Sequence, residues 1–203
     1  MKIFCIGRNY VDHAKELNNP VPKKPLVFSK PQTALVRENR PFFYPEFSKN
    51  IHHEIEIVLK VCRLGKHIAP KFAHKYYNEV TLGIDFTARD IQSQLKAKGH
   101  PWLLAKGFDG SAPIGKWLSI EEIGDVNNID FSMTKNEEII QAGNTKDLIF
   151  DFDYLITYIS QFFTLQIGDL IFTGTPAGVG PVVIGDKLEG FVGEQKLLEC
   201  NIK

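Results

Sequence analysis

The chain has 203 residues, of which 43% are hydrophobic and 24% are charged, and its 24 basic residues balance 24 acidic ones. This size and composition predict one globular domain, residues 1–203, with a substantial buried core. Since like charges do not cluster, the sequence offers no basic surface for nucleic acid or an anionic membrane. No segment reaches the ~18 consecutive apolar residues of a membrane span, and the first residues enter a strand-like run without a cleavage site. We therefore expect neither nucleic acid nor a membrane as partner, and a cytoplasmic location.

The predicted elements, in chain order, are mostly strands. Alternating or continuous apolar patterns predict strands at residues 3–6, 26–29, 51–61, 80–86, 129–134, 169–173 and 196–202. Capping residues and helical periodicity predict helices at residues 9–17, 70–78, 88–98, 119–123 and 151–163. Because the helices do not alternate regularly with the strands, the pattern favours a β-rich α+β fold, a curled sheet or sandwich with helices on its rim, over a doubly wound parallel sheet. Residues 18–31 are rich in proline and predict a stiff extended connection.

The cysteines give no sign of a structural crosslink. Cys5, Cys62 and Cys200 are widely spaced and form no CxxC pair. Neither a disulfide framework nor a zinc site is indicated. We expect all three to be small buried side chains.

Two acids occupy one face of the predicted strand 51–61. The apolar residues of this strand alternate, so Glu54 and Glu56 point the same way, roughly 6.5–7 Å apart along the backbone. Like charges that close repel unless a positive group lies between them. A third acid, Asp85, ends the run 80–86, and the three could converge on Mg²⁺ or Mn²⁺, which prefer oxygen ligands. Alternatively, Glu54 and Glu56 lie on a solvated strand face opposite lysines. Spacing alone leaves both possibilities open.

The predicted helix 9–17 carries a histidine and a glutamate on one face. His13 and Glu16 are i and i+3, and a carboxylate beside an imidazole orients the ring and raises its basicity. The pair could serve as a general base on water, or it could be an ordinary exposed helix face. Gly7 before the helix and the prolines after it would permit the helix to move as a lid.

Two further segments could contact a ligand. Lys106 follows an apolar run and precedes a glycine-rich turn, so it could hold an anion or extend into solvent. The segment TGTPAGVGP contains three glycines, which let the backbone approach a ligand closely, and Thr175 adds a hydroxyl. It is not a P-loop, since no Gly-Lys-Ser/Thr follows, and taken alone it indicates only a tight loop.

Several of these segments occur together and in a fixed order. They are GRNYVDHAKE, HHEIEIVL, GIDFTARDIQ with AKGFDGSAP, and TGTPAGVGP. The set resembles the fumarylacetoacetate hydrolase family, in particular its small single-domain branch of acylpyruvate hydrolases and oxaloacetate decarboxylases or tautomerases. The likeness extends from Gly7 to Pro181. It implies a β-rich roll of mixed sheets, of the kind found in the C-terminal domain of the family, with a short N-terminal lid helix and a homodimeric assembly.

The resemblance also implies roles for individual residues. The implied ligands of Mg²⁺ or Mn²⁺ are Glu54, Glu56 and Asp85. The implied catalytic residues are His13, Glu16 and Lys106. The implied substrate contacts are Arg8, Gln92 and Thr175, while Asn9 either contacts substrate or anchors the hinge of the lid.

These roles predict a metal-dependent hydrolase that cleaves the C–C bond of acylpyruvates through a metal-bound enolate. The ion would act as a Lewis acid on a chelated 2-oxo acid, and His13 would activate the attacking water. Oxaloacetate decarboxylation or tautomerisation could use the same site, as could a related isomerase or hydratase reaction. A non-catalytic protein that binds metal or oxo acids is the remaining alternative, and a binder has no use for a general base. The sequence chooses neither the substrate nor between Mg²⁺ and Mn²⁺.

Overall fold

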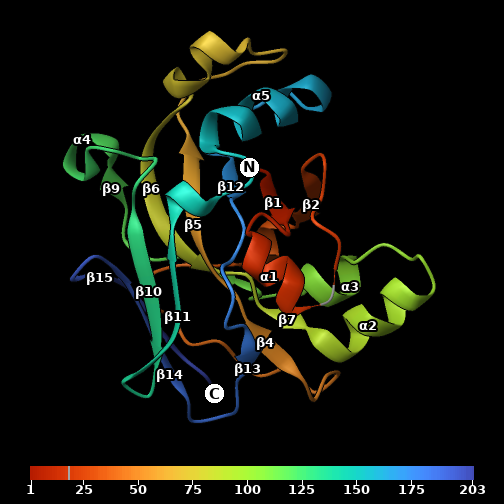
Figure 1. The fold of residues 1–203 in the computed structure, drawn as a ribbon. Helices are drawn as coiled ribbons and strands as arrows, with labels where there is room; N and C mark the ends of the chain where they lie inside the picture. The colour runs from red at the N-terminus through yellow and green to blue at the C-terminus, as the bar shows by residue number, and fades with distance from the viewer. Residues whose placement is uncertain (18) are drawn as a thin grey trace.

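A six-stranded mixed sheet forms the centre of the computed structural model, which describes residues 1–17 and 19–203 (Figure 1). Its order is β2 (Leu26–Lys30), β1 (Ile3–Gly7), β12 (Leu170–Phe172), β5 (Ile55–Val61), β6 (Tyr77–Ile84) and β9 (Leu118–Ser119). Strands β1 and β12 are parallel, and the other neighbours are antiparallel. Strand β5 begins where its antiparallel neighbour β6 ends, and the acidic residues of interest lie at this point.

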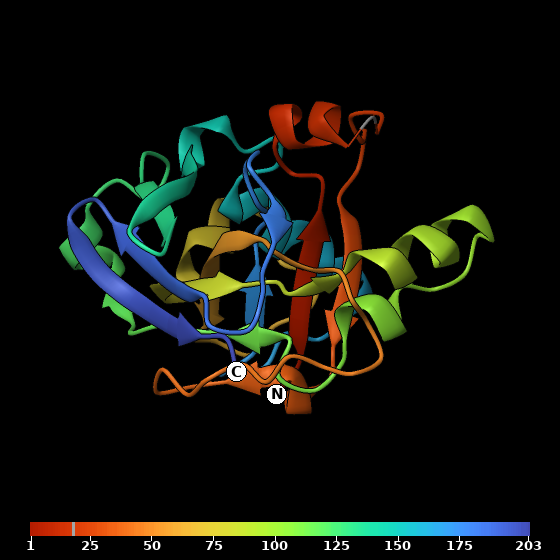
Figure 2. The same cartoon turned by 90° about the horizontal axis from the view of Figure 1, so that it is seen from below.

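A second, antiparallel sheet curves against the first (Figures 1 and 2). Its order is β11 (Glu138–Asn144), β10 (Asp130–Lys135), β14 (Lys187–Val192) and β15 (Gln195–Asn201). The strands bulge at Met133/Thr134 and at Gly190/Phe191, which increases the local twist. A side chain at Gly190 would meet Leu82 at 3.0 Å, so glycine lets β14 approach the first sheet closely.

Two small ladders complete the strands. One has the order β13 (Gly180–Pro181), β4 (Ile51–His53) and β7 (Thr87–Ala88), and the other pairs β3 (Leu35–Val36) with β8 (Ala112–Pro113). The core divides around the central sheet. The larger cluster includes Ile55 and Ile57 of β5, whereas Val58 packs into a smaller cluster with residues of β3 and β8. Strand β5 is therefore covered on both faces, which disagrees with the alternative of a solvated strand face at residues 51–61.

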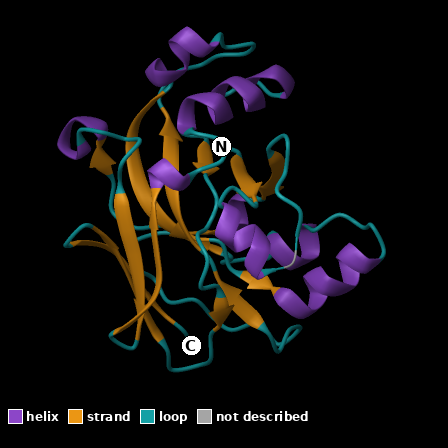
Figure 3. Ribbon diagram, viewed as in Figure 1, coloured by secondary structure: helices purple, strands orange, loops and turns teal. Residues whose placement is uncertain are grey.

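The helices lie around the sheets (Figure 3). They are α1 (Val11–Glu16), α2 (Arg89–Ala97), α3 (Leu103–Lys106), α4 (Ile120–Ile123) and α5 (Phe152–Phe162), with 3₁₀ turns η1 (Gln32–Ala34), η2 (Pro70–Lys75) and η3 (Thr145–Asp147). The predicted capping box of α4 is present: Ser119 Oγ accepts from the Glu122 N–H, and the Glu122 carboxylate accepts from the Ser119 N–H. No helix in the described part of the chain is long and apolar enough to cross a membrane.

The predicted β-rich α+β class is confirmed, with local corrections. The strand expected at residues 51–61 breaks at Glu54 into β4 and β5, and the helix expected at 70–78 is the short 3₁₀ turn η2. Strands β11 and β14 were not predicted, because their glycines and polar residues hide the apolar alternation. Cys62 is half-exposed, contrary to expectation, while Cys5 and Cys200 are buried. Asn18, the first residue of the predicted connection 18–31, lies outside the described residues.

Candidate metal centre and active site

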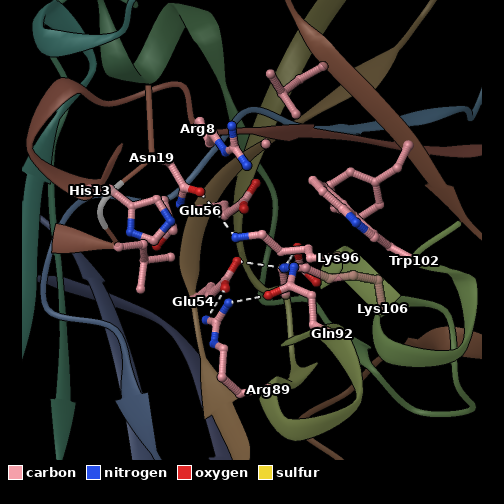
Figure 4. A pocket seen from close by; sticks show the side chains of 16 residues that line it. Arg8, His13, Asn19, Glu54, Glu56, Arg89, Gln92, Lys96, Trp102 and Lys106 are labelled. Atoms are coloured by element: carbon pink, nitrogen blue, oxygen red, sulfur yellow. Dashed lines mark hydrogen bonds and ion pairs between the residues drawn. The ribbon is translucent and has the colours of Figure 1, made fainter. Parts of the chain in front are cut away.

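Three carboxylates converge at the adjoining ends of β5 and β6. Glu54 precedes β5, Glu56 is its second residue, and Asp85 follows β6. The antiparallel pairing of these strands is extended by a hydrogen bond from the Asp85 N–H to the Glu54 carbonyl at 2.8 Å. One oxygen from each side chain lies within 4.8 Å of the others, and the three residues are only 4%, 2% and 1% exposed. Figure 4 shows Glu54 and Glu56 side by side in the pocket.

Buried cations neutralise two of these acids. Lys106 Nζ lies 2.7 Å from both Glu54 Oε2 and Asp85 Oδ2, and Lys30 Nζ lies 2.7 Å from Asp85 Oδ1. Arg89 Nη2 contacts the remaining oxygen of Glu54, Oε1, at 2.5 Å. Burial disfavours the charge on Glu54, but Lys106 and Arg89 outweigh it and hold the pKa of Glu54 well below its usual range. Burial likewise opposes the charge on Lys106, yet Asp85 and Glu54 raise its pKa, so the ammonium stays charged.

Glu56 differs from the other two acids. Its one hydrogen bond among the described residues comes from the Gly174 N–H to Oε2 at 2.7 Å, and no described cation forms an ion pair with it. Burial, followed by the charges of Asp85 and Glu54, raises the pKa of Glu56 well above its usual value. A cation placed between the three oxygens would remove this repulsion and displace the proton. The donors are all carboxylate oxygens, which suits Mg²⁺ or Mn²⁺ and does not suit a softer metal.

The histidine of α1 faces the same cavity. His13 is buried, and its Nδ1 lies 3.3 Å from Glu16 Oε2. The other oxygen of Glu16, Oε1, accepts a hydrogen bond from the Gly178 N–H at 3.0 Å. Glu16 therefore orients the imidazole and also joins α1 to the glycine-rich loop, residues 173–181.

The glycine-rich loop contacts both α1 and the acidic triad. Its Gly174 N–H holds Glu56 while its Gly178 N–H holds Glu16. Both glycines have positive φ, 107° and 98°, and a Cβ on Gly178 would lie 2.4 Å from a backbone carbonyl oxygen. Gln141 of β11 holds the loop in place, because its Nε2 donates to Thr175 Oγ1 at 2.9 Å and to the carbonyl of residue 176 at 3.0 Å. The position of this loop thus sets the geometry of both parts of the site.

The expected substrate contacts line the cavity together with the acids, His13 and Lys106. Arg8 enters from the end of β1, Gln92 from α2 and Thr175 from the glycine-rich loop. Asn9, by contrast, is fully buried: its amide nitrogen donates to the carbonyls of Phe150 and Thr173, and its oxygen accepts from the Phe150 N–H. Of its two suggested roles, the geometry favours anchoring the hinge.

The cavity measures about 40 Å³. This is less than the roughly 150 Å³ of a cavity that holds benzene, but the cavity is partly open to solvent. The α1 segment, six residues long and attached to the glycine-rich loop through Glu16, contributes His13 to its wall.

The structure brings the predicted site residues together. Those lining the cavity are Arg8, His13, Glu54, Glu56, Asp85, Gln92, Lys106 and Thr175, and Glu16 contacts it through His13. The alternatives of a solvated strand face, an exposed His13 and a solvent-exposed lysine disagree with the burial of these side chains. The catalytic, ligating and binding roles themselves stay predictions.

Sequence reasoning missed the two other cations that pair with the acids, Lys30 and Arg89, and it also missed Lys96 in the wall of the cavity. Lys30 is buried at the end of β2, where its Nζ contacts Asp85, both oxygens of Ser111 at 3.0 Å, and the carbonyls of Phe86 and Lys106. The only signal for it was a lysine that ends an apolar strand. Arg89 donates to Glu54 and to Gln92 Oε1, and its signal was the sequence ARD shortly after Asp85.

The sequence model described as "Fumarylacetoacetate (FAA) hydrolase C-terminal" matches residues 2–203. The chain belongs to the fumarylacetoacetate hydrolase family. The resemblance found in the sequence is thereby confirmed, and so is the expectation of an enzyme, since proteins of this family are hydrolases, decarboxylases and isomerases.

Curated members of the fumarylacetoacetate hydrolase family match nearly the whole chain. Oxaloacetate tautomerase FAHD1, mitochondrial, from Bos taurus is 40% identical over 187 residues, which cover 92% of this chain and 85% of the relative. Oxaloacetate decarboxylase, mitochondrial, from Dictyostelium discoideum is 43% identical over 189 residues, covering 93% and 87%. These mitochondrial names contradict the cytoplasmic location that was expected from the first residues and from the lack of a long apolar segment, and that expectation is wrong.

Solved structures of the family share the fold over the full chain. A fumarylacetoacetate hydrolase family protein from Yersinia pestis has a TM-score of 0.96 at 38% identity and covers 100% of this chain and 93% of its own. Fumarylpyruvate hydrolase from Pseudomonas aeruginosa, in complex with Mn²⁺ and pyruvate, has a TM-score of 0.94 at 33% identity, with coverage of 100% and 89%. The Mn²⁺ of that protein agrees with the divalent cofactor predicted here, and the acidic triad of this chain is able to bind such an ion.

Proposed function

We propose that this chain is a divalent-metal-dependent enzyme acting on small 2-oxo acids, and that it hydrolyses the C–C bond of acylpyruvates. One observation carries the proposal: Glu56 is a buried carboxylate that faces two other acids and pairs with no cation among the described residues, in a cavity lined also by His13, whose partner is Glu16. Such a group calls for a bound cation, and such a pair is suited to activate water. Residues 1–203 would form a single catalytic domain.

Glu54, Glu56 and Asp85 would hold Mg²⁺ or Mn²⁺. When bound, the ion supplies Lewis acidity toward the 2-oxo acid. Lys106 and Arg89 lower the pKa of Glu54, and Asp85 pairs with Lys30 and Lys106, whereas the raised pKa of Glu56 makes it the ligand that must lose a proton. The buried cations thus keep two of the three ligands ready for the ion.

His13 is placed to act as general base. With Glu16 accepting at Nδ1, the neutral ring leaves Nε2 free to take a proton from water. The water oxygen bonds to the C4 carbonyl carbon, the C3–C4 bond breaks, and its electron pair moves to C3 and onto the C2 oxygen. Return of the proton to C3 gives pyruvate and a carboxylic acid. Lys106, itself buried, stabilises the negative charge that develops beside it.

A second candidate reaction is the tautomerisation or decarboxylation of oxaloacetate. The observation that favours it is the 40–43% identity to proteins named for these activities. Tautomerisation needs only proton transfer at C3, for which His13 is also placed. Decarboxylation releases CO₂ from C4 and leaves the same electron pair on C3.

Product analysis separates the candidates. Acetylpyruvate, fumarylpyruvate and oxaloacetate would each be incubated with the purified chain in Mg²⁺, in Mn²⁺ and with a chelator, and the products identified by NMR. We expect metal-dependent release of pyruvate from at least one acylpyruvate. Enolisation or CO₂ release from oxaloacetate alone would favour the second candidate, and conversion of none of the three would refute the proposed function.

We further propose that the chain forms a homodimer. Support comes from the family resemblance, which implies a homodimeric assembly, and the exposed side chains of Phe43, Leu104 and Phe47 (71%, 68% and 54%) are available for such a contact. Light scattering after gel filtration should give twice the mass of 23.0 kDa. A mass near 23.0 kDa at micromolar concentration would contradict the dimer.

A further inference from the structure

His53 belongs to the segment HHEIEIVL, and the chemistry proposed above gives it no role. It is the last residue of β4, it is buried, and its Nδ1 lies 3.0 Å from Gln141 Oε1. The ring also lies against the end of the glycine-rich loop, since a Cβ on Gly180 would be 3.4 Å from His53 Nε2. His53 is therefore next to the loop and to the side chain that holds the loop.

Gln141 is a buried amide with a partner at each of its hydrogen-bonding positions. On its oxygen side are the Ile55 N–H at 3.1 Å and the His53 ring. On its nitrogen side are Thr175 Oγ1 at 2.9 Å and the carbonyl oxygen of residue 176 at 3.0 Å. A backbone N–H can only donate and a carbonyl can only accept. Ile55 and residue 176 therefore fix which end of the amide is oxygen and which is nitrogen.

The orientation of the amide decides the roles of its other two partners. Because His53 lies on the oxygen side, its Nδ1 must carry a hydrogen and donate it. Because Thr175 lies on the nitrogen side, its hydroxyl oxygen must accept. The hydrogen of that hydroxyl is left over. Its acceptor among the described residues is the carbonyl of residue 176 at 3.5 Å, which is long for an O–H···O hydrogen bond and already accepts from Gln141.

The remaining hydrogen of Thr175 is available to a ligand. Thr175 is buried and lines the cavity of the acidic triad. A buried hydroxyl without a good acceptor costs free energy, and an anionic ligand oxygen would recover it through a charge-assisted hydrogen bond. A reversed amide would instead turn this hydrogen toward Gln141 and away from the cavity.

We propose that His53 and Gln141 are positioning residues: His53 holds the amide of Gln141, and the amide makes Thr175 a hydrogen-bond donor to an oxygen of the bound oxo acid. The role of Thr175 rests on the proposed function, which supplies that oxygen. Neither positioning residue lines the cavity, so both act through Thr175. Gln141 also holds the N–H of Ile55, between Glu54 and Glu56, and so ties the ligating strand to the same loop.

Thr175→Val removes the hydroxyl and keeps the shape of the side chain, so its effect on binding measures this hydrogen bond. Calorimetric titration of the Mn²⁺-loaded protein with pyruvate should show about tenfold weaker binding in Thr175→Val. In Gln141→Met the carbonyl of residue 176 loses its donor, and the Thr175 hydroxyl is free to turn toward it. Thr175→Val added to Gln141→Met should therefore weaken binding by less than about threefold.

Two substitutions of His53 form a matched pair. His53→Asn places an amide N–H near the position of Nδ1 and should keep most of the tenfold effect of Thr175→Val. His53→Leu has no donor and should reduce that effect to about threefold. His52→Leu, at the neighbouring histidine, whose Nε2 contacts Asn50 instead, is the control and should leave the effect of Thr175→Val unchanged.

The effect of Thr175→Val distinguishes positioning from a purely structural role. Structural residues would lower the melting temperature and the affinity for pyruvate, yet leave the effect of Thr175→Val near tenfold in Gln141→Met and His53→Leu, and that result would overturn the proposal. Equal effects in His53→Asn and His53→Leu would also overturn it, as would unchanged binding in Thr175→Val alone or absence of pyruvate binding to the wild type. Thermal unfolding shows which variants are folded, and the His53 pair carries the test if Gln141→Met is not.

The test is independent of the proposed reaction, because binding of pyruvate is measured without turnover. Failure to convert any acid in the product panel refutes the proposed function alone.

Discussion

Replacement of Glu56 by glutamine tests most directly whether this buried carboxylate binds the metal. The two side chains have the same shape, so Glu56→Gln keeps the hydrogen bond from the Gly174 N–H and removes one buried negative charge. The new amide can also donate to a neighbouring carboxylate. We expect the metal-free variant to be more stable than the wild type at neutral and alkaline pH, and to lose its response to metal.

The size of the effect follows from the spacing of the acids. Two carboxylate charges at the 4.8 Å limit repel by about 3–4 kcal/mol at an effective dielectric constant near 20. Glu56 faces two such charges, and Lys106 and Lys30 largely offset them. Protonation of Glu56 removes more of the remaining repulsion. A net gain of about 1–3 kcal/mol in the free energy of unfolding remains for Glu56→Gln at pH 8.

The sign of the pH dependence is fixed by the raised pKa of Glu56. The folded protein holds this proton to higher pH than the unfolded chain does. The contribution of Glu56 to stability is therefore fully present below the ordinary glutamate pKa near 4.5 and is lost as pH rises toward its raised value. The gap between Glu56→Gln and the wild type should widen from pH 5 to pH 8.

Urea denaturation with a chelator and with Mn²⁺ measures both effects. Mn²⁺ at about 100 times its dissociation constant should stabilise the wild type by about 2.7 kcal/mol and leave Glu56→Gln nearly unchanged. Glu79→Gln on β6, a half-exposed glutamate paired with Lys60, is the control for loss of one charge. A metal-free Glu56→Gln that is less stable than the wild type at pH 8, or one that Mn²⁺ stabilises fully, would refute the reasoning.

Three more substitutions probe separate parts of the site. His13→Ala should lower kcat by about 10²–10⁴-fold and leave the Mn²⁺ affinity unchanged. The control His100→Ala, at an exposed histidine, should change neither kcat nor the Mn²⁺ affinity, and unchanged turnover in His13→Ala would exclude His13 as the base. Lys30→Met leaves Asp85 Oδ1 without its buried cation and should lower the free energy of unfolding by about 3–5 kcal/mol in urea, whereas a loss below about 1 kcal/mol would contradict the ion pair. Gln141→Leu should cost about 1–3 kcal/mol and speed amide exchange in the glycine-rich loop, and slow exchange would show that the loop is held by other contacts.

The site residues that could be predicted from the sequence lie close to one another in the chain or on neighbouring strands. Glu54 immediately precedes β5, Glu56 lies in it, and Asp85 immediately follows β6, so the antiparallel pairing of β5 and β6 brings the three acids together. His13 and Glu16 share a helical turn. Local spacing and the family resemblance are therefore enough to predict that the acids and the histidine pair belong to one site.

The rest of the site depends on contacts between distant segments. Lys30 meets Asp85 across 55 positions of the chain, and its strand gives no sign that β2 ends in a buried pocket. Gln141 reaches the glycine-rich loop from β11, a strand whose polar pattern concealed it. The burial of both faces of β5 has the same cause, because the covering strands come from other parts of the chain. Sequence periodicity predicts which residues of a strand share a face, but it does not predict which other segments pack against that face.

The buried charges suggest why a site of this kind acts on 2-oxo acids. The three acids and the three cations that pair with them, Lys30, Lys106 and Arg89, balance one another once Glu56 is ionised. Arg8 and Lys96 add two more positive charges to the lining of the cavity, and a divalent ion would add a further two. An anionic substrate would offset part of this excess on binding, and the electron pair that moves from C3 onto the C2 oxygen would offset more of it. The positive charge of the site would thus be better compensated in the transition state than in the substrate complex, which is the condition for electrostatic interactions to accelerate a reaction.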